Sequence, residues 1–373
     1  MTAPDKTTSS ATARVAVLDG LRGLAVAMVL IHHLHEYVPR LWPGQAAFGI
    51  SGPLAHAMSF LWAGVDLFYV LSGFLIASAV LRPKEWQPLA FIKSRLTRIL
   101  PAYYISMVVA VLLLNLDLLS GMQGWVNIAM HLLMLHTMQE WTLFAINGPY
   151  WTLGVEFGFY LFMLAFAPVW RTRQGWVMLL LMLAVCYVWK ASALLGHAAP
   201  AQRFFWSAQL PGALDEFALG MAVALARDRG WLDRLLPRAS LWGAILAVLG
   251  TLIFLACIRH LTRLQTDYWM HWNTVLFIRT LLGLGFALLI AAFLLLARGP
   301  VLPWLVRWSG LGWLGAVSYS AYLYHVPVIL LMHRAVGAGS FPGWTWIAAV
   351  VFITFAVSYA SHRWVEQRWH PNL

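Results

Sequence analysis

Residues 18–36 read Leu-Asp-Gly-Leu-Arg-Gly-Leu-Ala-Val-Ala-Met-Val-Leu-Ile-His-His-Leu-His-Glu, an apolar stretch with a charged start and a histidine-rich end. As a helix, it places Arg22 and His33, 11 residues apart, on nearly the same face and roughly 16 Å apart along the axis. Ionisable groups inside a membrane are costly and indicate a functional site by default. The alternative is that Arg22 snorkels as a topology anchor while the histidines reach the far interface.

The composition around this stretch is that of a polytopic membrane protein. Of 373 residues, 61% are hydrophobic and 10% are charged, with a mean hydropathy of +0.73. Apolar runs of about 20 residues, enough to cross a bilayer, recur along the chain. The net charge of +11 does not indicate a nucleic-acid partner, because basic cytoplasmic loops are typical of such proteins. Cys186 and Cys257 lie in separate apolar runs and are expected to be packing residues.

These runs predict an all-α fold with about ten transmembrane helices and one shorter helix. The expected spans cover about residues 20–38, 57–80, 99–115, 151–169, 176–194, 206–226, 240–258, 275–297, 313–333 and 344–362. The shorter run, Trp125 to Met138, contains Asn127, His131 and His136, and is expected to be interfacial or re-entrant. Residues 1–17 are expected to form a flexible cytoplasmic tail rather than a signal peptide, and residues 18–373 one membrane domain.

The distribution of lysine and arginine predicts the orientation in the membrane. An even number of spans places both termini on one side. With the N-terminus inside, 18 lysines and arginines fall in inner segments and 6 in outer segments, while Arg279 lies within a span. Because basic residues favour cytoplasmic loops, both termini are predicted to be cytoplasmic, in a plasma (inner) membrane.

Five carboxylates fall in or against the predicted spans, and they are Glu36, Asp66, Glu156, Asp215 and Glu216. Each such placement costs a few kcal/mol or more unless the group is paired or hydrated, so chance is a poor explanation for five of them. Asp66 shares the second span with Ser72 and several glycines, where close helix packing is the alternative explanation.

Two arginines mark the cytoplasmic end of the third span. Arg95 and Arg98 are three residues apart, so they lie on one helix face. Two adjacent guanidinium groups suit a phosphorylated ligand, and anchoring to lipid phosphates is the alternative. His325, in the ninth span, is by itself more typical of a hydrogen-bonded packing residue than of a catalyst.

Taken in order, these segments resemble the acyltransferase-3 family of integral-membrane acyltransferases. The resemblance extends from residue 18 to about residue 370, and its motifs are specific together rather than singly. The motifs are Leu18-Asp19-Gly20-Leu21-Arg22-Gly23, Arg22 and His33 separated by ten residues, Gly64-Val65-Asp66-Leu67-Phe68-Tyr69 with Ser72-Gly73-Phe74, Arg95-x-x-Arg98-Ile99-x-Pro101, Trp151-Thr152-Leu153-x-x-Glu156-x-x-x-Tyr160, Ser318-Tyr319-x-x-Tyr322-Leu323-x-His325 and Val365-Glu366.

The sequence departs from the family pattern in several places. Tyr69 stands where a second phenylalanine is more frequent, and Glu366-Gln367-Arg368 replaces a Glu-x-Pro ending. Histidines are crowded after the first apolar run, and the spacing from Arg22 selects His33 among them. Many relatives carry an added periplasmic esterase-like domain. None is expected here, so recognition of the acceptor would fall to the membrane domain or to a separate periplasmic partner.

The resemblance implies transfer of an acyl group, usually acetyl, from cytoplasmic acyl-CoA to a hydroxyl group of a cell-envelope carbohydrate or similar acceptor. Acyl-CoA would be the donor substrate, and no tightly bound cofactor or metal is expected. The predicted donor site comprises Arg22, Arg95, Arg98 and Ser72. His33 would lie roughly 16 Å deeper than Arg22, a distance that an extended pantetheine arm can bridge.

His33 is the predicted general base, because histidine serves near neutral pH with little adjustment of its pKa. Asp66, which is preferred, or Glu36 would orient its ring, and Glu156 completes the predicted catalytic set. Direct transfer and a covalent acyl intermediate both stay open. One rival interpretation is a proton-coupled transporter that uses His33, Asp66 and Glu156 as a relay, although transporters more often show internal repeats. Another is a catalytically silent assembly partner.

Overall fold

The computed structural model describes residues 6–337 and 343–369, and these residues form helices and connecting turns without β-strands. Eight helices in this part of the chain are long and apolar enough to cross a membrane. The predicted fold class, a polytopic helical membrane protein, is confirmed. Two further expected spans correspond to α9 (Leu210–Asp228) and α14 (Ser318–Val336), which have 19 residues each. Charged and polar side chains make both helices less apolar than the eight.

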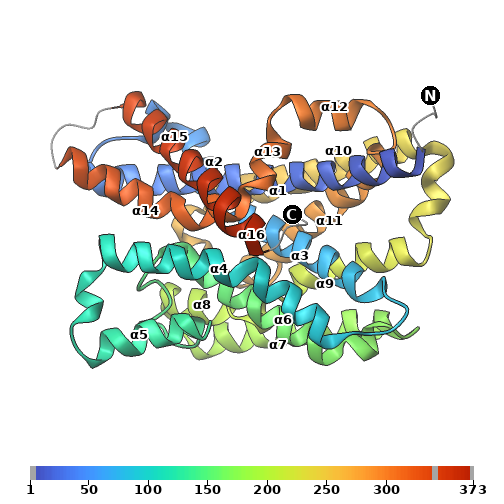
Figure 1. The fold of residues 1–373 in the computed structure, drawn as a ribbon, viewed down its shortest axis with the longest axis horizontal. Coiled ribbons are helices and arrows are strands. Elements are labelled where there is room, and N and C mark those ends of the chain that lie inside the picture. The colour runs from blue at the N-terminus through green and yellow to red at the C-terminus, as the bar shows by residue number, and fades with distance from the viewer. Residues whose placement is uncertain (1–5, 338–342, 370–373) are drawn as a thin grey trace. The chain divides into compact units, whose positions relative to one another are not determined.

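The helices are labelled in Figure 1 and fall into two compact units. Unit 1 comprises Met1–Ala27, Trp62–Trp86 and Ala165–Ala316, and unit 2 comprises Met28–Leu61, Gln87–Leu164 and Val317–Leu373. Two helices, α1 (Lys6–Leu41) and α6 (Trp151–Trp170), continue from one unit into the other. Helix α1 begins well before the expected start of the first span near residue 20. Residues 1–5 of the predicted tail lie outside the described residues.

The other helices of unit 1 are α3 (Ala63–Leu81), α7 (Gly175–Gly196), α8 (Pro200–Ser207), α9, α10 (Ala239–Leu264), α11 (Trp272–Leu296), α12 (Val301–Trp308) and α13 (Leu311–Ala316). Glycines bring α3 and α9 together. A Cβ on Gly73 would lie 2.2 Å from the Phe217 carbonyl oxygen, and one on Gly220 would lie 1.9 Å from that of Val70. Only glycine permits such backbone contact between two membrane helices, which is the packing role expected for the glycines of this span.

The glycines of the opening motif have a similar role in unit 1. A Cβ on Gly23 would lie 2.2 Å from the carbonyl oxygen of Leu311, and one on Gly315 would lie 1.8 Å from that of Asp19. The first turns of the apolar part of α1 therefore pack directly against α13. This contact gives the motif a structural reason that is independent of catalysis.

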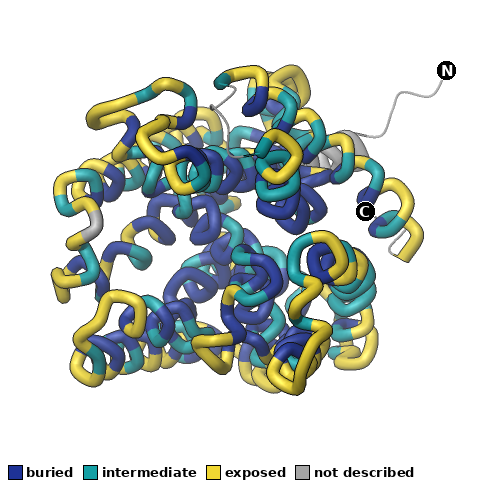
Figure 2. Tube along the Cα trace, turned by 90° about the vertical axis from the view of Figure 1, so that its left-hand side faces the viewer, coloured by how far each residue is buried: buried dark blue, intermediate teal, exposed yellow. Residues whose placement is uncertain are grey.

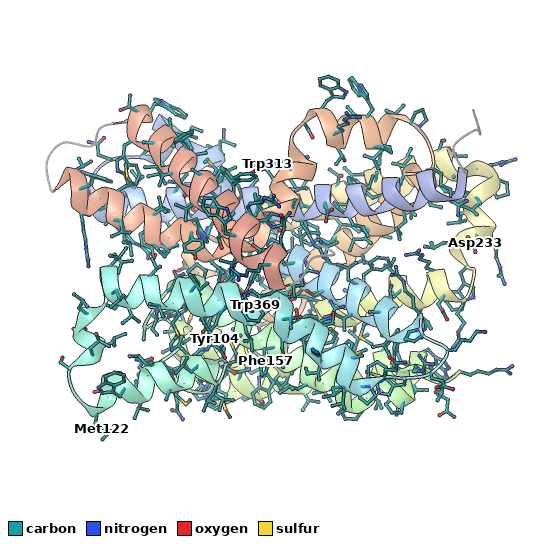
Figure 3. The ribbon with its side chains drawn as sticks, viewed as in Figure 1. Tyr104, Met122, Phe157, Asp233, Trp313 and Trp369 are labelled. Carbon is teal, nitrogen blue, oxygen red and sulfur yellow. The ribbon has the colours of Figure 1, made fainter. Side chains whose placement is uncertain are left out.

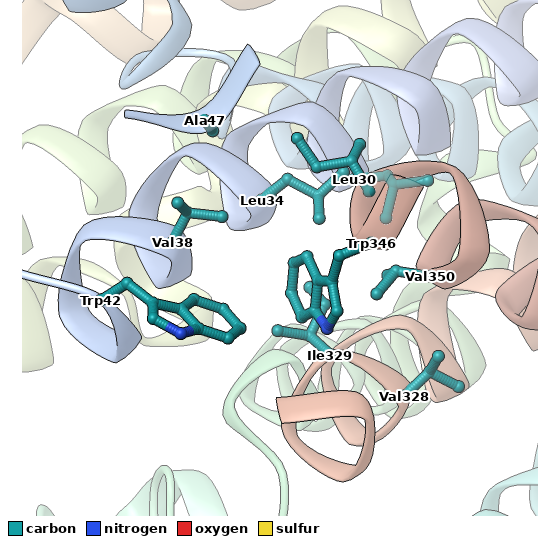
Figure 4. Packing of buried hydrophobic residues seen from close by; sticks show 10 residues of the cluster. Leu30, Leu34, Val38, Trp42, Ala47, Val328, Ile329, Trp346 and Val350 are labelled. Atoms are coloured by element: carbon teal, nitrogen blue, oxygen red, sulfur yellow. The ribbon is translucent and has the colours of Figure 1, made fainter. Parts of the chain in front are cut away.

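Unit 2 contains α2 (Gly52–Met58), α4 (Pro88–Leu114), α5 (Met122–Leu132), α14, α15 (Trp344–Ser361) and α16 (Gln367–Trp369), with the short turns η3 (His136–Met138), η4 (Gly148–Tyr150) and η7 (His362–Glu366). Its apolar core joins α1, α14 and α15 (Figure 4). Leu30, Leu34 and Val38 recur every four residues and form one stripe of α1. The Trp42 and Trp346 rings meet edge to face, with centroids 5.0 Å apart. This packing holds α1 beside α14.

The run from Trp125 to Met138 forms the short helix α5 and the turn η3, so a helix too short to span the membrane is confirmed there. Helix α5 begins at Met122 and is tied to α4 by Tyr104, whose hydroxyl donates to the Leu132 carbonyl oxygen at 2.8 Å (Figure 3). Its location at an interface or inside the membrane stays a prediction.

Apolar side chains line the outward side of several helices. On α10, Leu241, Val248, Leu252 and Leu255 share one face and are each about half exposed. Figure 2 shows buried and exposed stretches alternating along individual helices. An exposed apolar stripe is expected where one side of a helix packs on protein and the other faces lipid.

Candidate functional site

Two histidine rings meet inside unit 2. The Nδ1 atom of His33, on α1, lies 3.1 Å from Nε2 of His325, on α14, and the ring centroids are 4.8 Å apart. His33 is half-buried, whereas His325 is only 1% exposed. Each ring also faces a carbonyl oxygen one turn earlier on its own helix. His33 Nδ1 lies 2.9 Å from the Val29 oxygen, and His325 Nδ1 lies 3.0 Å from the Ala321 oxygen. The two rings are therefore held in fixed orientations.

The neighbouring histidines of α1 differ from His33 in their surroundings. The His32 ring lies edge to face with that of His33 at 5.0 Å, and it hydrogen-bonds to the backbone of Ser59. The Nδ1 atoms of His32 and His35 are buried without a hydrogen-bond partner in the described chain. Among the three histidines, His33 is the one whose ring nitrogen meets that of His325. Its role as the base stays a prediction.

The two carboxylates expected to orient His33 have arginine partners. Glu36 accepts a hydrogen bond from Arg40 at 2.6 Å, one turn later on α1. Asp66 belongs to unit 1, where it lies 3.5 Å from the guanidinium of Arg279. Orientation of the His33 ring by Asp66 stays a prediction. Within unit 2, His325 is the residue whose ring nitrogen contacts His33. The sequence alone predicts only a packing role for His325.

A second group of motif residues gathers between α4 and α6. The Tyr160 hydroxyl donates to Glu156 Oε1 at 2.8 Å, and both Arg95 and Arg98 interact electrostatically with Tyr160. The Nε atom of Arg95 is buried without a hydrogen-bond partner in the described chain. Two cations beside one carboxylate leave a surplus of positive charge, which suits an anionic ligand.

This proximity differs from the predicted topology. With the N-terminus inside, the fourth span (151–169) begins at the outer surface and so places Glu156 close to it, whereas Arg95 and Arg98 are predicted at the cytoplasmic surface. The reason is where α6 begins. The Tyr150 ring, just before α6, is 4.8 Å from that of Tyr103, which lies past the middle of α4. The first turn of α6 is therefore beside the interior of α4, and Glu156 comes within reach of Arg95.

Hydrogen bonds and a ring contact connect the two groups within unit 2. The hydroxyls of Thr152, in the first turn of α6, and Tyr322, on α14, are 2.7 Å apart. The Tyr322 ring is in turn 5.7 Å from that of His325. Asn147 donates to the Leu323 carbonyl oxygen at 2.9 Å, which fixes the start of α6 against α14. The motifs around Glu156 and His325 thus form one continuous structure.

The remaining residues of the predicted donor site lie in unit 1. Arg22 pairs with Asp19 at 2.8 Å on the same helix, and Ser72 is half-buried on α3. Arg95 and Arg98 lie in unit 2. A common donor site made by all four residues stays a prediction.

Unit 1 contains a buried charge network that sequence reasoning recognised only in part. Lys190 Nζ lies 2.7 Å from Asp215 Oδ2, and both side chains are fully buried. Arg279 lies 3.3 Å from Glu216 as well as close to Asp66. Lys190 is one of the six basic residues assigned to outer segments, and the sequence predicts no partner for it. The five acidic residues predicted to matter include three of this network, because a carboxylate in an apolar run indicates an unseen cationic partner.

Comparison with known protein families assigns most of the chain to one domain family. A family model described as an acyltransferase domain matches residues 15–363. The chain belongs to the acyltransferase-3 family. No solved structure matches this member of the family.

Three relatives of this family member are similar over most of its length. Peptidoglycan O-acetyltransferase OatA of Listeria monocytogenes is 26% identical over 364 residues, which cover 90% of this chain and 56% of OatA. YrhL of Bacillus subtilis, provisionally named a peptidoglycan O-acetyltransferase, is 28% identical over 362 residues, which cover 89% of this chain and 55% of YrhL. BcsY of Komagataeibacter xylinus, provisionally named a membrane-bound transacylase, is 27% identical over 92% of this chain and 80% of BcsY. The chain spans about half the length of OatA and YrhL.

Proposed function

We propose that this acyltransferase-3 member transfers an acyl group, with acetyl as the first candidate, from cytoplasmic acyl-CoA to a hydroxyl group of a cell-envelope carbohydrate. Peptidoglycan is the first acceptor to test, because two relatives are named for its O-acetylation. The observation that carries the proposal is the half-buried His33 in the same unit as Arg95 and Arg98. Acyl transfer from CoA requires a base and a site with surplus positive charge that binds the CoA phosphates.

In the proposed reaction, His33 removes the proton of the acceptor hydroxyl as its oxygen attacks the thioester carbonyl carbon. The carbon–oxygen bond forms, the carbon–sulfur bond breaks, and the CoA thiolate leaves with the electron pair. The proton on His33 then passes to that thiolate, so the histidine is regenerated. Arg95 and Arg98 hold the CoA phosphates, and Glu156 limits the positive charge of the pair when no donor is bound.

The proposal is tested with membrane vesicles of both orientations that contain the protein. Labelled acetyl-CoA is supplied on one face only, and the envelope carbohydrate fractions are analysed by mass spectrometry for acyl esters. Label is expected in the carbohydrate only when acetyl-CoA faces the cytoplasmic side. Transfer from the opposite face would contradict the donor orientation, and the absence of any acyl ester would contradict the activity.

A proton-coupled transporter is the second candidate, and the buried network of Asp66, Glu216 and Arg279 in unit 1 favours it. Such a transporter would acidify proteoliposomes in response to a substrate without consuming acetyl-CoA. Measurement of internal pH and of released CoA on the same vesicles separates the two functions.

A further inference from the structure

The carbonyl oxygens around the paired histidines determine which ring nitrogens carry protons. A carbonyl oxygen can only accept a hydrogen bond. The Ala321 oxygen, 3.0 Å from His325 Nδ1, therefore requires a proton on that nitrogen. In the neutral ring, the lone pair then lies on Nε2, which is the atom that faces His33 at 3.1 Å.

The same reasoning applies to the other ring. The Val29 oxygen lies 2.9 Å from His33 Nδ1, so this nitrogen also carries a proton. That single N–H faces two acceptors, the Val29 oxygen and the lone pair of His325 Nε2. The lone pair of His33 is therefore on Nε2, which takes part in neither of these two hydrogen bonds.

We propose that His325 is the positioning residue for His33: its Nε2 accepts the His33 Nδ1–H, which leaves Nε2 of His33 as the basic nitrogen. This inference rests on the proposed function, in which His33 is the base, and it adds the identity of the orienting group and of the reacting atom. An imidazole then takes the place of the carboxylate that orients the base in many hydrolases.

The burial of the two rings fits these roles. His33 is half-buried, so one part of its ring is open to a substrate, whereas His325 is 1% exposed and its Nε2 is occupied by His33. Glu36, the nearest carboxylate along α1, is engaged by Arg40 at 2.6 Å. His325 thus orients His33 without itself being placed to meet the acceptor.

The hydrogen bond gains strength during turnover. When Nε2 of His33 takes the acceptor proton, the ring becomes an imidazolium, and its Nδ1–H becomes a charged donor to His325. Hydrogen bonds to charged groups are stronger than neutral ones. The proton leaves from Nε2 to the CoA thiolate, while the Nδ1 proton stays on His33 and the His325 ring stays neutral throughout. The stabilisation therefore acts on the transition state more than on donor binding.

The test compares His325→Leu, which removes the acceptor at similar size, with His325→Gln, whose amide oxygen can accept from His33 near the position of Nε2. We expect His325→Leu to lower kcat about 10–100-fold, the loss that corresponds to one hydrogen bond to a charged group, and to leave KM for acetyl-CoA unchanged. His325→Gln should recover most of this loss. Equal losses in both variants, or a rise in KM without a change in kcat, would overturn the positioning role.

A second measurement requires neither the His325 variants nor an activity assay. Nitrogen-15 NMR of histidine-labelled wild-type protein, with His33 assigned by its loss in His33→Gln, reports the tautomer directly. We expect a protonated Nδ1, an unprotonated Nε2 and a scalar coupling across the hydrogen bond to His325. An unprotonated Nδ1 on His33 would overturn the inference. If the wild type shows the expected tautomer but transfers no acyl group, the proposed function fails and the role of His325 in catalysis fails with it.

Discussion

The Arg95→Met substitution tests the donor site, because this arginine combines burial with an unsatisfied donor. Its Nε is buried and has no hydrogen-bond partner in the described chain, and its guanidinium stacks over the Phe91 ring at 5.8 Å. A phosphate oxygen that accepts from this Nε–H would make a hydrogen bond between charged groups, worth about 1.5–3 kcal/mol. At about 1.4 kcal/mol per tenfold change, loss of the bond weakens CoA binding about 10–100-fold. Methionine keeps the apolar stem over Phe91, so the fold should be retained.

Isothermal titration with CoA and with pantetheine, which lacks the phosphates, measures this effect. The matched control is Lys93→Met, which removes an exposed cation two residues earlier on α4. Arg95→Met should weaken CoA binding and leave pantetheine binding unchanged, and Lys93→Met should affect neither. If Arg95→Met weakens both ligands equally, or neither, the arginine does not hold a CoA phosphate and the reasoning is refuted.

Three further predictions concern stability, measured as thermal unfolding in detergent. Lys190→Met should destabilise the protein by about 3–5 kcal/mol, because it leaves the Asp215 carboxylate buried without its cation. The double variant with Asp215→Asn should recover most of this loss. If the losses of the two single variants simply add in the double variant, the pairing is contradicted. Burial beside another histidine lowers the pKa of His131 to about 3, so the folded state keeps this ring neutral. Stability should therefore fall as the pH drops below the ordinary value of 6.5, by up to about 1.4 kcal/mol per pH unit, and His131→Gln should flatten this slope. Gly220→Ala should cost about 1–3 kcal/mol through overpacking of α3 on α9, whereas Gly196→Ala, with open space around its Cβ, should be neutral.

The helical membrane fold could be predicted from the sequence because apolar runs of sufficient length have few other uses. Glycines in the second span likewise predicted close packing, which Gly73 confirms. Of the ten expected spans, α9 and α14 are less apolar than the other eight. Helix α9 carries the buried Asp215 and Glu216, and α14 carries His325. Polar residues needed for a site or a network thus weaken the signal by which their own helices are recognised.

The pairing of the site residues was harder to predict than their importance. Spacing along one helix shows which residues share a face, so it could single out His33. It could not show that a residue 292 positions later meets that ring, because this depends on how α1 and α14 pack. For the same reason, the sequence did not predict that Glu156 lies near Arg95. Their proximity depends on where α6 begins along α4, and the contact of Tyr150 with Tyr103 sets that position.

The turnover of His33→Gln, compared with the exposed-histidine control His56→Gln, tests the central claim most directly. Acetyl transfer from acetyl-CoA and CoA binding are measured on the same purified preparations. The account predicts that His33→Gln lowers turnover roughly 10²–10⁴-fold, the usual contribution of a general base, while CoA binding persists and His56→Gln remains active. Acetyl transfer at the wild-type rate by His33→Gln would contradict the assignment of this histidine as the base.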